Sequence, residues 1–533
     1  MIAVVVFGAA AVFTASGTAF GETVFRRGNG AEPETLDVHT SQGVGSANIQ
    51  RDLFEGLVSE ARDASLIPGA AERWEISADG TVYTFHLRKD GRWSNGDPVT
   101  AQDFVFAMHR LVDPATAAPY AFIAYPIENA KAIASGVEKD LSKMGVKAID
   151  DLTLKITLER PTPYFLGMLT HASMLPVHRQ SVARLGTKWI KPGNMISNGA
   201  YKLTEWAPQS HITLVKNPYF HDAQHVRIDK VIYYPTENTA SEMKQYRAGE
   251  LDFTYVISLN DYAWVMKNLK AEASITPYLG VYYYDINLNK EKFKDPRVRK
   301  ALNLAIDHEI ITEKVTRQGQ LPAYSFVPPA TAHHRPVTPD WAKWSQAERT
   351  AKAKELMAQA GYSRAHPLKV DILYNTMADH KRIAIAIASM WKRIGVVTSM
   401  RNEEWKALIN SRNLKQFEVA RDGWIGDYND PYTFLQILRS DAGPMNNPGY
   451  SNPKFDALLD AANRELDPDR RADLLAKAEA VMLGDLPVIP IYFYVDRHMV
   501  KPYLKGFQGN IMGHYLTRWM WIDKGGPAQN IAR

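Results

Sequence analysis

The chain has 533 residues, of which 45% are hydrophobic and 23% are charged. These values are ordinary for a globular protein and exclude disordered, collagen-like and low-complexity chains. The 63 Lys and Arg residues against 58 Asp and Glu residues form no dense basic run, so we do not expect a nucleic-acid partner. The absence of cysteine excludes thiol nucleophiles, CxxC redox pairs and cysteine zinc sites.

Residues 1–21 have the pattern of a secretory signal peptide. An apolar run covers residues 2–12, and Ala19-Phe20-Gly21 has the small-x-small form that signal peptidase accepts. The run is short for a membrane span, so we expect export and cleavage after residue 21, with an uncleaved membrane anchor as the alternative.

The first half of the chain predicts helices mixed with short antiparallel strands. Ile49, Leu53 and Leu57 are spaced four apart, as on one face of a helix. Polar and apolar residues alternate around Asp79-Gly80, which predicts a β-hairpin. The later segments expected to form strands are 152–158, 199–206, 211–216 and 230–235.

The second half predicts a separate α/β lobe. Pro296 is placed to begin a helix, and Ser345 with Glu348 forms a capping box. After these helices the pattern alternates strand, helix and strand, which favours parallel pairing, at residues 368–374, 380–394 and 396–401.

Two longer apolar segments, residues 278–287 and 486–495, predict strands buried on both faces. They lie on either side of the α/β region in the sequence. We expect them to form two parallel crossings between lobes, and therefore a hinge.

No catalytic motif is complete. His308-Glu309 begins like a zinc-protease helix, but Thr312 stands where the second histidine is needed. A P-loop, a nucleophile elbow and an intact dinucleotide fingerprint are absent from the sequence. We therefore expect neither an enzyme nor a metal site nor a cofactor.

The segment 419–431 concentrates groups suited to a zwitterionic ligand. It contains Arg421, Asp427, a tryptophan and two glycines that let a ligand approach the backbone closely. On an ideal strand Arg421 and Asp427 would share a face about 20 Å apart, so either the glycines bend the chain or the ligand is long. The alternative is an ordinary loop with a structural Arg–Asp pair.

Stretches along the whole mature chain resemble the oligopeptide-binding proteins, the periplasmic receptors that deliver peptides to ABC importers. The matching stretches are 51–57, 119–121, 197–203, 246–252, 282–287, 373–376, 423–431 and 492–495.

This resemblance implies an α/β fold, a two-lobed periplasmic binding protein (type II-like, cluster C) with an extra inserted domain and two hinge strands. Domain I would comprise residues 22–54, 180–279 and 496–533. Domain II, the insertion, would cover 55–179, and domain III, the second lobe, 280–495. Such receptors are usually monomers in the periplasm.

The resemblance also implies a binding site for short peptides. Asp427 corresponds to the carboxylate that holds the peptide α-ammonium, and Arg421 to a guanidinium that takes the α-carboxylate. His380 and Arg412 match basic groups that serve other peptide lengths. The further ligand-binding positions, most of them contacting the peptide main chain, are Gln42, Val44, Tyr120, Gly423, Trp424, Ile425 and Asn446.

Among the departures from the family pattern, Gln42 replaces an acidic residue common there, and Thr316 replaces a lysine. The leading hypothesis is a periplasmic receptor that captures short peptides and passes them to ABC transporter permease subunits at the inner membrane. The alternatives are a relative specialised for murein peptides or for another solute such as haem or a metal chelate, an exported hydrolase, and a secreted chaperone or adhesin.

Overall fold

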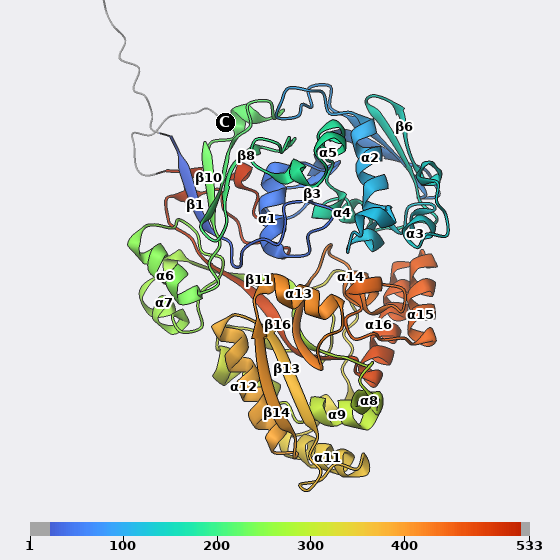
Figure 1. Cartoon of the computed structure of the whole chain (residues 1–533), viewed down its shortest axis with the longest axis vertical. Coiled ribbons are helices and arrows are strands. Elements are labelled where there is room, and N and C mark those ends of the chain that lie inside the picture. The colour runs from blue at the N-terminus through green and yellow to red at the C-terminus, as the bar shows by residue number, and fades with distance from the viewer. Residues whose placement is uncertain (1–21, 524–533) are drawn as a thin grey trace, which may run out of the picture.

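The computed structural model describes residues 22–523. The expected signal peptide, residues 1–21, lies outside the described residues. The chain forms two bodies, one above the other in Figure 1, and the long strands β11 (Ala273–Ile286) and β16 (Val488–Met499) run between them. The two-lobed α/β architecture expected from the resemblance is confirmed.

The remaining strands are short. They are β1 (Val24–Gly28), β2 (Val58–Glu60), β3 (Leu66–Pro68), β4 (Ala71–Ile76), β5 (Val82–Leu87), β6 (Val146–Asp150), β7 (Thr153–Thr157), β8 (Tyr201–Ala207), β9 (His211–Lys216), β10 (Lys230–Tyr234), β12 (Leu321–Pro322), β13 (Lys369–Asn375), β14 (Val397–Glu403), β15 (Val419–Ile425), β17 (Leu504–Lys505) and β18 (Trp521–Ile522).

The α-helices cover both bodies. They are α1 (Val44–Leu53), α2 (Ala101–Val112), α3 (Ala130–Ala134), α4 (Phe165–Met168), α5 (Arg179–Leu185), α6 (Thr239–Ala248), α7 (Tyr262–Asn268), α8 (Glu291–Lys294), α9 (Pro296–Leu304), α10 (His308–Ile310), α11 (Gln346–Gln359), α12 (Ala378–Lys392), α13 (Trp405–Asn413), α14 (Tyr432–Leu435), α15 (Pro453–Arg464) and α16 (Pro468–Asp485).

The upper body contains two four-stranded sheets, in the orders β1-β10-β9-β8 and β4-β5-β7-β6. The hairpin expected around Asp79-Gly80 is confirmed, because β4 and β5 pair antiparallel and Gly80 takes the positive φ of 69° that its turn requires. The helix predicted from Ile49, Leu53 and Leu57 ends earlier than expected. Phe54 is extended, so Leu57 is buried outside α1.

The lower body is built on a six-stranded sheet in the order β12-β16-β11-β15-β13-β14. β13 and β14 pair in parallel through the crossover helix α12, as the sequence predicts. The two crossing strands β11 and β16 are adjacent, but the expectation that they are parallel is wrong: they pair antiparallel. The chain enters the lower body on one strand and returns on the other, so their directions are opposed.

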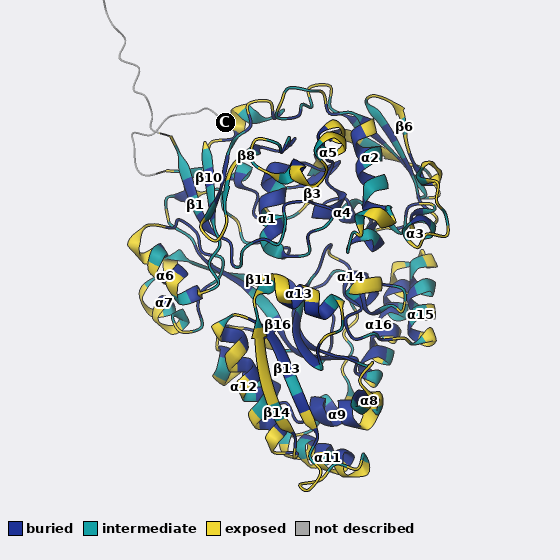
Figure 2. Ribbon diagram, viewed as in Figure 1, coloured by how far each residue is buried: buried dark blue, intermediate teal, exposed yellow. Residues whose placement is uncertain are grey.

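Burial follows this plan, as Figure 2 shows. Tyr282, Tyr283 and Tyr284 of β11 are all buried, which confirms a strand covered on both faces. The edge strand β14 is largely exposed. Across residues 22–523, no helix combines the length and the apolar character needed to cross a membrane.

Candidate ligand-binding cleft

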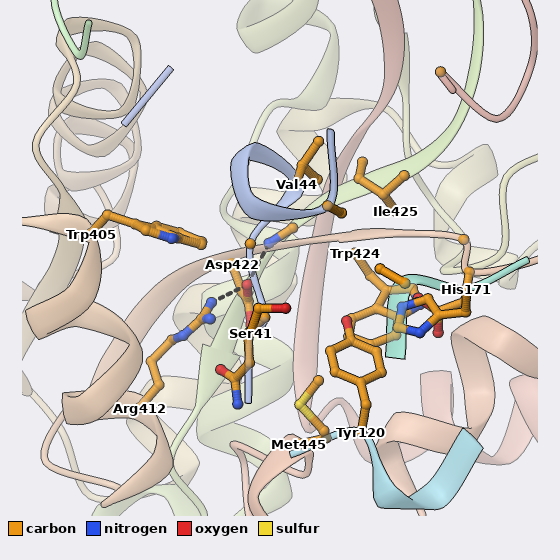
Figure 3. A pocket seen from close by; sticks show the side chains of 18 of the residues that line it. Ser41, Val44, Tyr120, His171, Trp405, Arg412, Asp422, Trp424, Ile425 and Met445 are labelled. Atoms are coloured by element: carbon orange, nitrogen blue, oxygen red, sulfur yellow. Dashed lines mark hydrogen bonds and ion pairs between the residues drawn. The ribbon is translucent and has the colours of Figure 1, made fainter. Parts of the chain in front are cut away.

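Two adjoining cavities of about 130 and 220 Å³ are lined by residues from both bodies. Val44, at the start of α1, and Ile425, at the end of β15, line both cavities, and Figure 3 shows them in the smaller one. The two cavities share part of their lining, and together they are called the cleft. The shared residues are Val44, Tyr278, Trp405, Gly423, Ile425 and Gly513.

Strand β15 has one edge that is only partly paired. It pairs with β11 over its whole length, from Val419 to Ile425. On its other side it pairs with β13 only at Val419 and Ala420. Residues 421–425 therefore have no strand partner on that side within the described chain. An open strand edge of this kind can hydrogen-bond the main chain of an extended peptide.

Side chains of β15 alternate between the two cavities. Arg421 lines only the larger cavity, whereas Asp422 and Trp424 line only the smaller one. This alternation is the geometry of a β-strand, in which successive side chains point to opposite faces. The strand ends at Ile425, and Asp427 follows in the smaller cavity. The idealised picture of Arg421 and Asp427 on one face is therefore wrong, because the strand ends before Asp427.

Asp427 is a buried carboxyl group with few partners. Its side chain is 5% exposed, and Thr433 donates a hydrogen bond of 3.3 Å to Oδ2. Nε2 of His171, from the upper body, lies 3.4 Å from Oδ1. Burial raises the pKa of Asp427 to about 8, which outweighs the opposing effects of the Thr433 hydrogen bond and the Arg51 charge. A cation placed beside this group would favour its charged form.

The upper-body groups that face Asp427 do not supply a strong ion pair. Burial lowers the pKa of His171 well below its usual value, so the imidazole is neutral. The backbone N–H of Ser173 donates to His171 Nδ1 over 3.2 Å, which leaves Nε2 to carry the hydrogen that faces Asp427. Arg51 lines the same cavity, and its buried Nε has no hydrogen-bond partner among the described residues.

Arg421 is a buried cation with uncharged partners. Its guanidinium donates hydrogen bonds to Tyr494 over 2.7 Å and to Asn375 over 3.2 Å, and lies 4.8 Å from the centre of the Tyr282 ring. Its Nε has no hydrogen-bond partner, and within residues 22–523 no carboxylate forms an ion pair with it. Arg421 is therefore available to an anionic group in the larger cavity.

His380 lines the larger cavity, but not as a cation. Burial, followed by the neighbouring Arg421 charge, lowers its pKa well below the usual value. Its Nδ1 lies 3.3 Å from the Tyr282 hydroxyl. The expectation of a basic group at this position therefore changes to that of a neutral hydrogen-bonding imidazole.

Arg412 lines the smaller cavity from α13, and its charge is already balanced. It forms an ion pair with Asp422, drawn as a dashed line in Figure 3. Asn447 also donates to Asp422, over 3.0 Å. Arg412 thus differs from the free basic group expected from the sequence, because Asp422 already pairs with it. Asp422 can do so because it follows Arg421 in β15 and its side chain points to the opposite face.

The other expected positions divide as follows. Tyr120 lies in the smaller cavity, where its ring stacks on Trp424 with 6.1 Å between ring centres. Asn446 lines neither cavity, because its side-chain amide is bonded to the backbone of Arg439 and Tyr450. The expected positions that line the cleft are Gln42, Val44, Tyr120, His380, Arg412, Arg421, Gly423, Trp424, Ile425 and Asp427.

Several cleft residues are not evident from the sequence. His171 and Arg51 reach Asp427 from distant parts of the chain, and no local pattern marks either. The position of Asp422 could have been predicted, since it follows Arg421 directly in a predicted strand and its side chain must therefore face the other way.

Within the described residues, no group of three or more His, Cys, Asp or Glu side chains is arranged to hold a metal ion.

Comparison with known proteins places the chain in a family. Residues 65–446 match the family model described as "Bacterial extracellular solute-binding proteins, family 5 Middle". The periplasmic oligopeptide-binding protein OppA of Salmonella typhimurium is 43% identical over 91% of this chain and 89% of its own length. The crystal structure of Haemophilus influenzae OppA in complex with RPPGFSPFR superposes with a TM-score of 0.91 at 40% identity, covering 94% and 99% of the two chains.

Two structures of the murein tripeptide-binding protein MppA, the first of them from Escherichia coli, differ in their likeness to this chain. One has a TM-score of 0.92 and covers 94% of this chain and 99% of its own, whereas the unliganded open form scores 0.67 and covers 94% and 98%, both at 38% identity. The two bodies of this chain are therefore not arranged as in that open form. With these similarities over nearly the whole chain, the protein belongs to family 5 of the bacterial extracellular solute-binding proteins.

Proposed function

We propose that this chain is a periplasmic receptor that captures short peptides between its two lobes and delivers them to an ABC importer. The signal-like residues 1–21 would direct export, and the receptor would dock as a monomer on permease subunits of the inner membrane. It would act without cofactor, without nucleic acid and without cleaving its ligand. Domain I (22–54, 180–279 and 496–533) would form the upper body with domain II (55–179), and domain III (280–495) the lower body.

The observation that carries this proposal is the pairing of two incompletely satisfied charged groups with an open strand edge. Asp427 lacks a strong counter-ion in one cavity, Arg421 lacks a carboxylate in the other, and residues 421–425 have an unpaired side. A peptide carries an ammonium at one end, a carboxylate at the other and a main chain between them. Backbone pairing supplies affinity without selecting a sequence, while the end charges fix the orientation.

The ammonium contact has the largest expected contribution. A charge-assisted hydrogen bond in a closed site contributes about 1.5 to 3 kcal/mol. Removing one partner costs more than the bond contributes, since the remaining charge stays buried. Asp427 is therefore the residue on which the proposal depends most.

The identity of the ligand is tested by native mass spectrometry of protein purified gently from the periplasm. A mixed population of short peptides, released on denaturation, is the expected result. Recovery of a single murein peptide would favour the specialised alternative, which the likeness to MppA supports. Recovery of haem or a metal chelate would contradict the peptide proposal.

The exported hydrolase is the alternative from another class. Ser173, His171 and Asp427 are in sequential contact, with 2.7 Å from Ser173 Oγ to His171 Nδ1 and 3.4 Å from His171 Nε2 to Asp427. Ser173, however, is 2% exposed and lines neither cavity. A nucleophile has to reach its substrate, so this arrangement does not favour hydrolysis. Incubation with labelled tripeptides should return only intact ligand.

A further inference from the structure

The smaller cavity contains a charge pair that has no role in the end-charge scheme. Arg412 and Asp422 form an ion pair in the lining of this cavity, and both are more than nine-tenths buried. In Figure 3 their side chains lie on the opposite side of the cavity from His171. The pair lies among the groups that line the space beside Asp427, so a ligand held by its ammonium would place a side chain near it.

Asp422 is held in place by several donors. In addition to the ion pair with Arg412, the backbone N–H of Gly423 donates to Oδ1 over 2.7 Å, and the side chain of Asn447 donates to Oδ2 over 3.0 Å. Together these contacts hold the Asp422 side chain in one position. Asp422 therefore stays paired with Arg412 when the cleft is empty.

A second carboxyl group, that of Asp285, interacts with both Asp422 and Arg412. Asp285 of β11 is 1% exposed. Burial, followed by the charge of Asp422, raises the pKa of Asp285 well above the ordinary value, which favours its protonated form. Lys415, which is near Asp285, lines neither cavity and donates to the backbone oxygen of Asn446 over 2.6 Å.

The other guanidinium of the smaller cavity, that of Arg51, belongs to the surroundings of Asp427. Arg51 interacts electrostatically with Glu60 and Asp427, both of which are buried. Arg412, the guanidinium beside Asp422, therefore offers no unpaired charge to a ligand. In the larger cavity, by contrast, Arg421 has only uncharged hydrogen-bond partners.

From this arrangement we infer that Asp422 is a specificity-determining residue, which neutralises Arg412 and so makes the smaller cavity reject peptide side chains that carry a carboxylate. A ligand carboxylate in this space would have to displace Asp422 or share Arg412 with it. Either way one buried negative charge is left without a partner, and such a charge is costly. Neutral side chains meet no such penalty. The inference deepens the proposed function and rests on it.

The test compares tripeptides that differ by one charge. Tri-alanine hosts carrying Glu or Gln at each position in turn are titrated by calorimetry into the wild-type protein and into Asp422→Asn. At the position whose side chain enters the smaller cavity, the wild type should bind the Gln peptide about tenfold or more tightly than the Glu peptide. Asp422→Asn frees Arg412 and should reduce or invert that ratio by a similar factor.

The double variant Arg412→Gln/Asp422→Asn is the matched control and should lose the gain for Glu, because the freed cation is gone. Asp422→Ala provides a second uncharged residue if the Asn variant fails to melt cooperatively. Equal affinity of the wild type for Glu and Gln peptides at every position would overturn the inference without any variant. A ratio of Glu-peptide to Gln-peptide affinity that is the same in the wild type, in Asp422→Asn and in Asp422→Ala would also overturn it. Failure of every tripeptide to bind the wild type would instead overturn the proposed function, and this inference with it.

Discussion

Arg421 lies within β15 and Asp427 lies two residues beyond the end of that strand, and the two side chains line different cavities of one cleft. The strand segment between them has an unpaired edge. A peptide that runs along this edge would reach a buried carboxyl group at one end and a guanidinium without a carboxylate partner at the other. This relationship leads to three predictions, and a contact outside the cleft adds a fourth.

Peptide binding should release a proton. Burial raises the pKa of Asp427 to about 8, so the empty site is mostly protonated at neutral pH. The peptide ammonium requires the carboxylate, and affinity should therefore rise by up to about tenfold per pH unit between about pH 5 and 7. Above about pH 8 the gain should stop, because the peptide amine then loses its own proton.

Calorimetry in buffers of different ionisation enthalpy measures the released proton directly. At about pH 6.5 the wild type should release about one proton per peptide bound, and Asp427→Asn should release none. Proton uptake, or equal release by both proteins, would contradict this assignment of the ammonium site.

The two arginines of the cleft should respond differently to removal of the peptide carboxylate. For the peptide length that reaches Arg421, C-terminal amidation should weaken binding to the wild type and have little further effect on Arg421→Gln. Arg412→Gln should retain the preference for the free acid, because Arg412 is already paired with Asp422. Calorimetry on dipeptides to pentapeptides, as acids and amides, measures both. A preference that disappears in Arg412→Gln and persists in Arg421→Gln would reverse the assignment.

A contact outside the cleft should strengthen the binding of all ligands alike. Tyr164 of the upper body donates a hydrogen bond of 2.9 Å to Asn463 of the lower body, and its ring stacks on Tyr428 with 5.1 Å between centres. Neither Tyr164 nor Asn463 lines the two cavities. Tyr164→Phe keeps the ring and removes the hydrogen bond, so it should disfavour the closed arrangement by about 0.5 to 1.5 kcal/mol.

That cost should appear as a similar loss of affinity for tripeptides of different sequence, together with a larger radius of gyration in solution scattering at subsaturating ligand. Asn463→Ala should weaken binding in the same way, since it removes the other partner. A loss confined to particular peptide sequences would indicate a direct ligand contact instead.

Much of the fold could be predicted because its signals are local. Asp79-Gly80 determines its hairpin through a turn that requires a positive φ, and Ser345 with Glu348 forms the capping box of α11. The direction of β16 relative to β11 could not be predicted in this way. Strand pairing depends on the path of the chain between the two segments, and hydrophobic periodicity carries no information about that path.

The site was predictable to a similar degree. Arg421 and Asp427 stand within one unusual segment, so local density identified them. His171 comes close to Asp427 only after two distant parts of the chain fold against each other. The neutral state of His380 and the pairing of Arg412 depend on burial and on neighbours, and sequence spacing specifies neither.

The most direct test of the central claim combines Asp427→Ala with acetylation of the peptide N-terminus, measured by calorimetry near pH 7.5. We expect the variant to bind a free tripeptide more weakly by roughly 3 to 5 kcal/mol, since the peptide ammonium is then buried without its partner. The acetylated peptide should bind weakly to both proteins, with little difference between them. Equal dissociation constants of the free peptide for the wild type and Asp427→Ala would contradict the account.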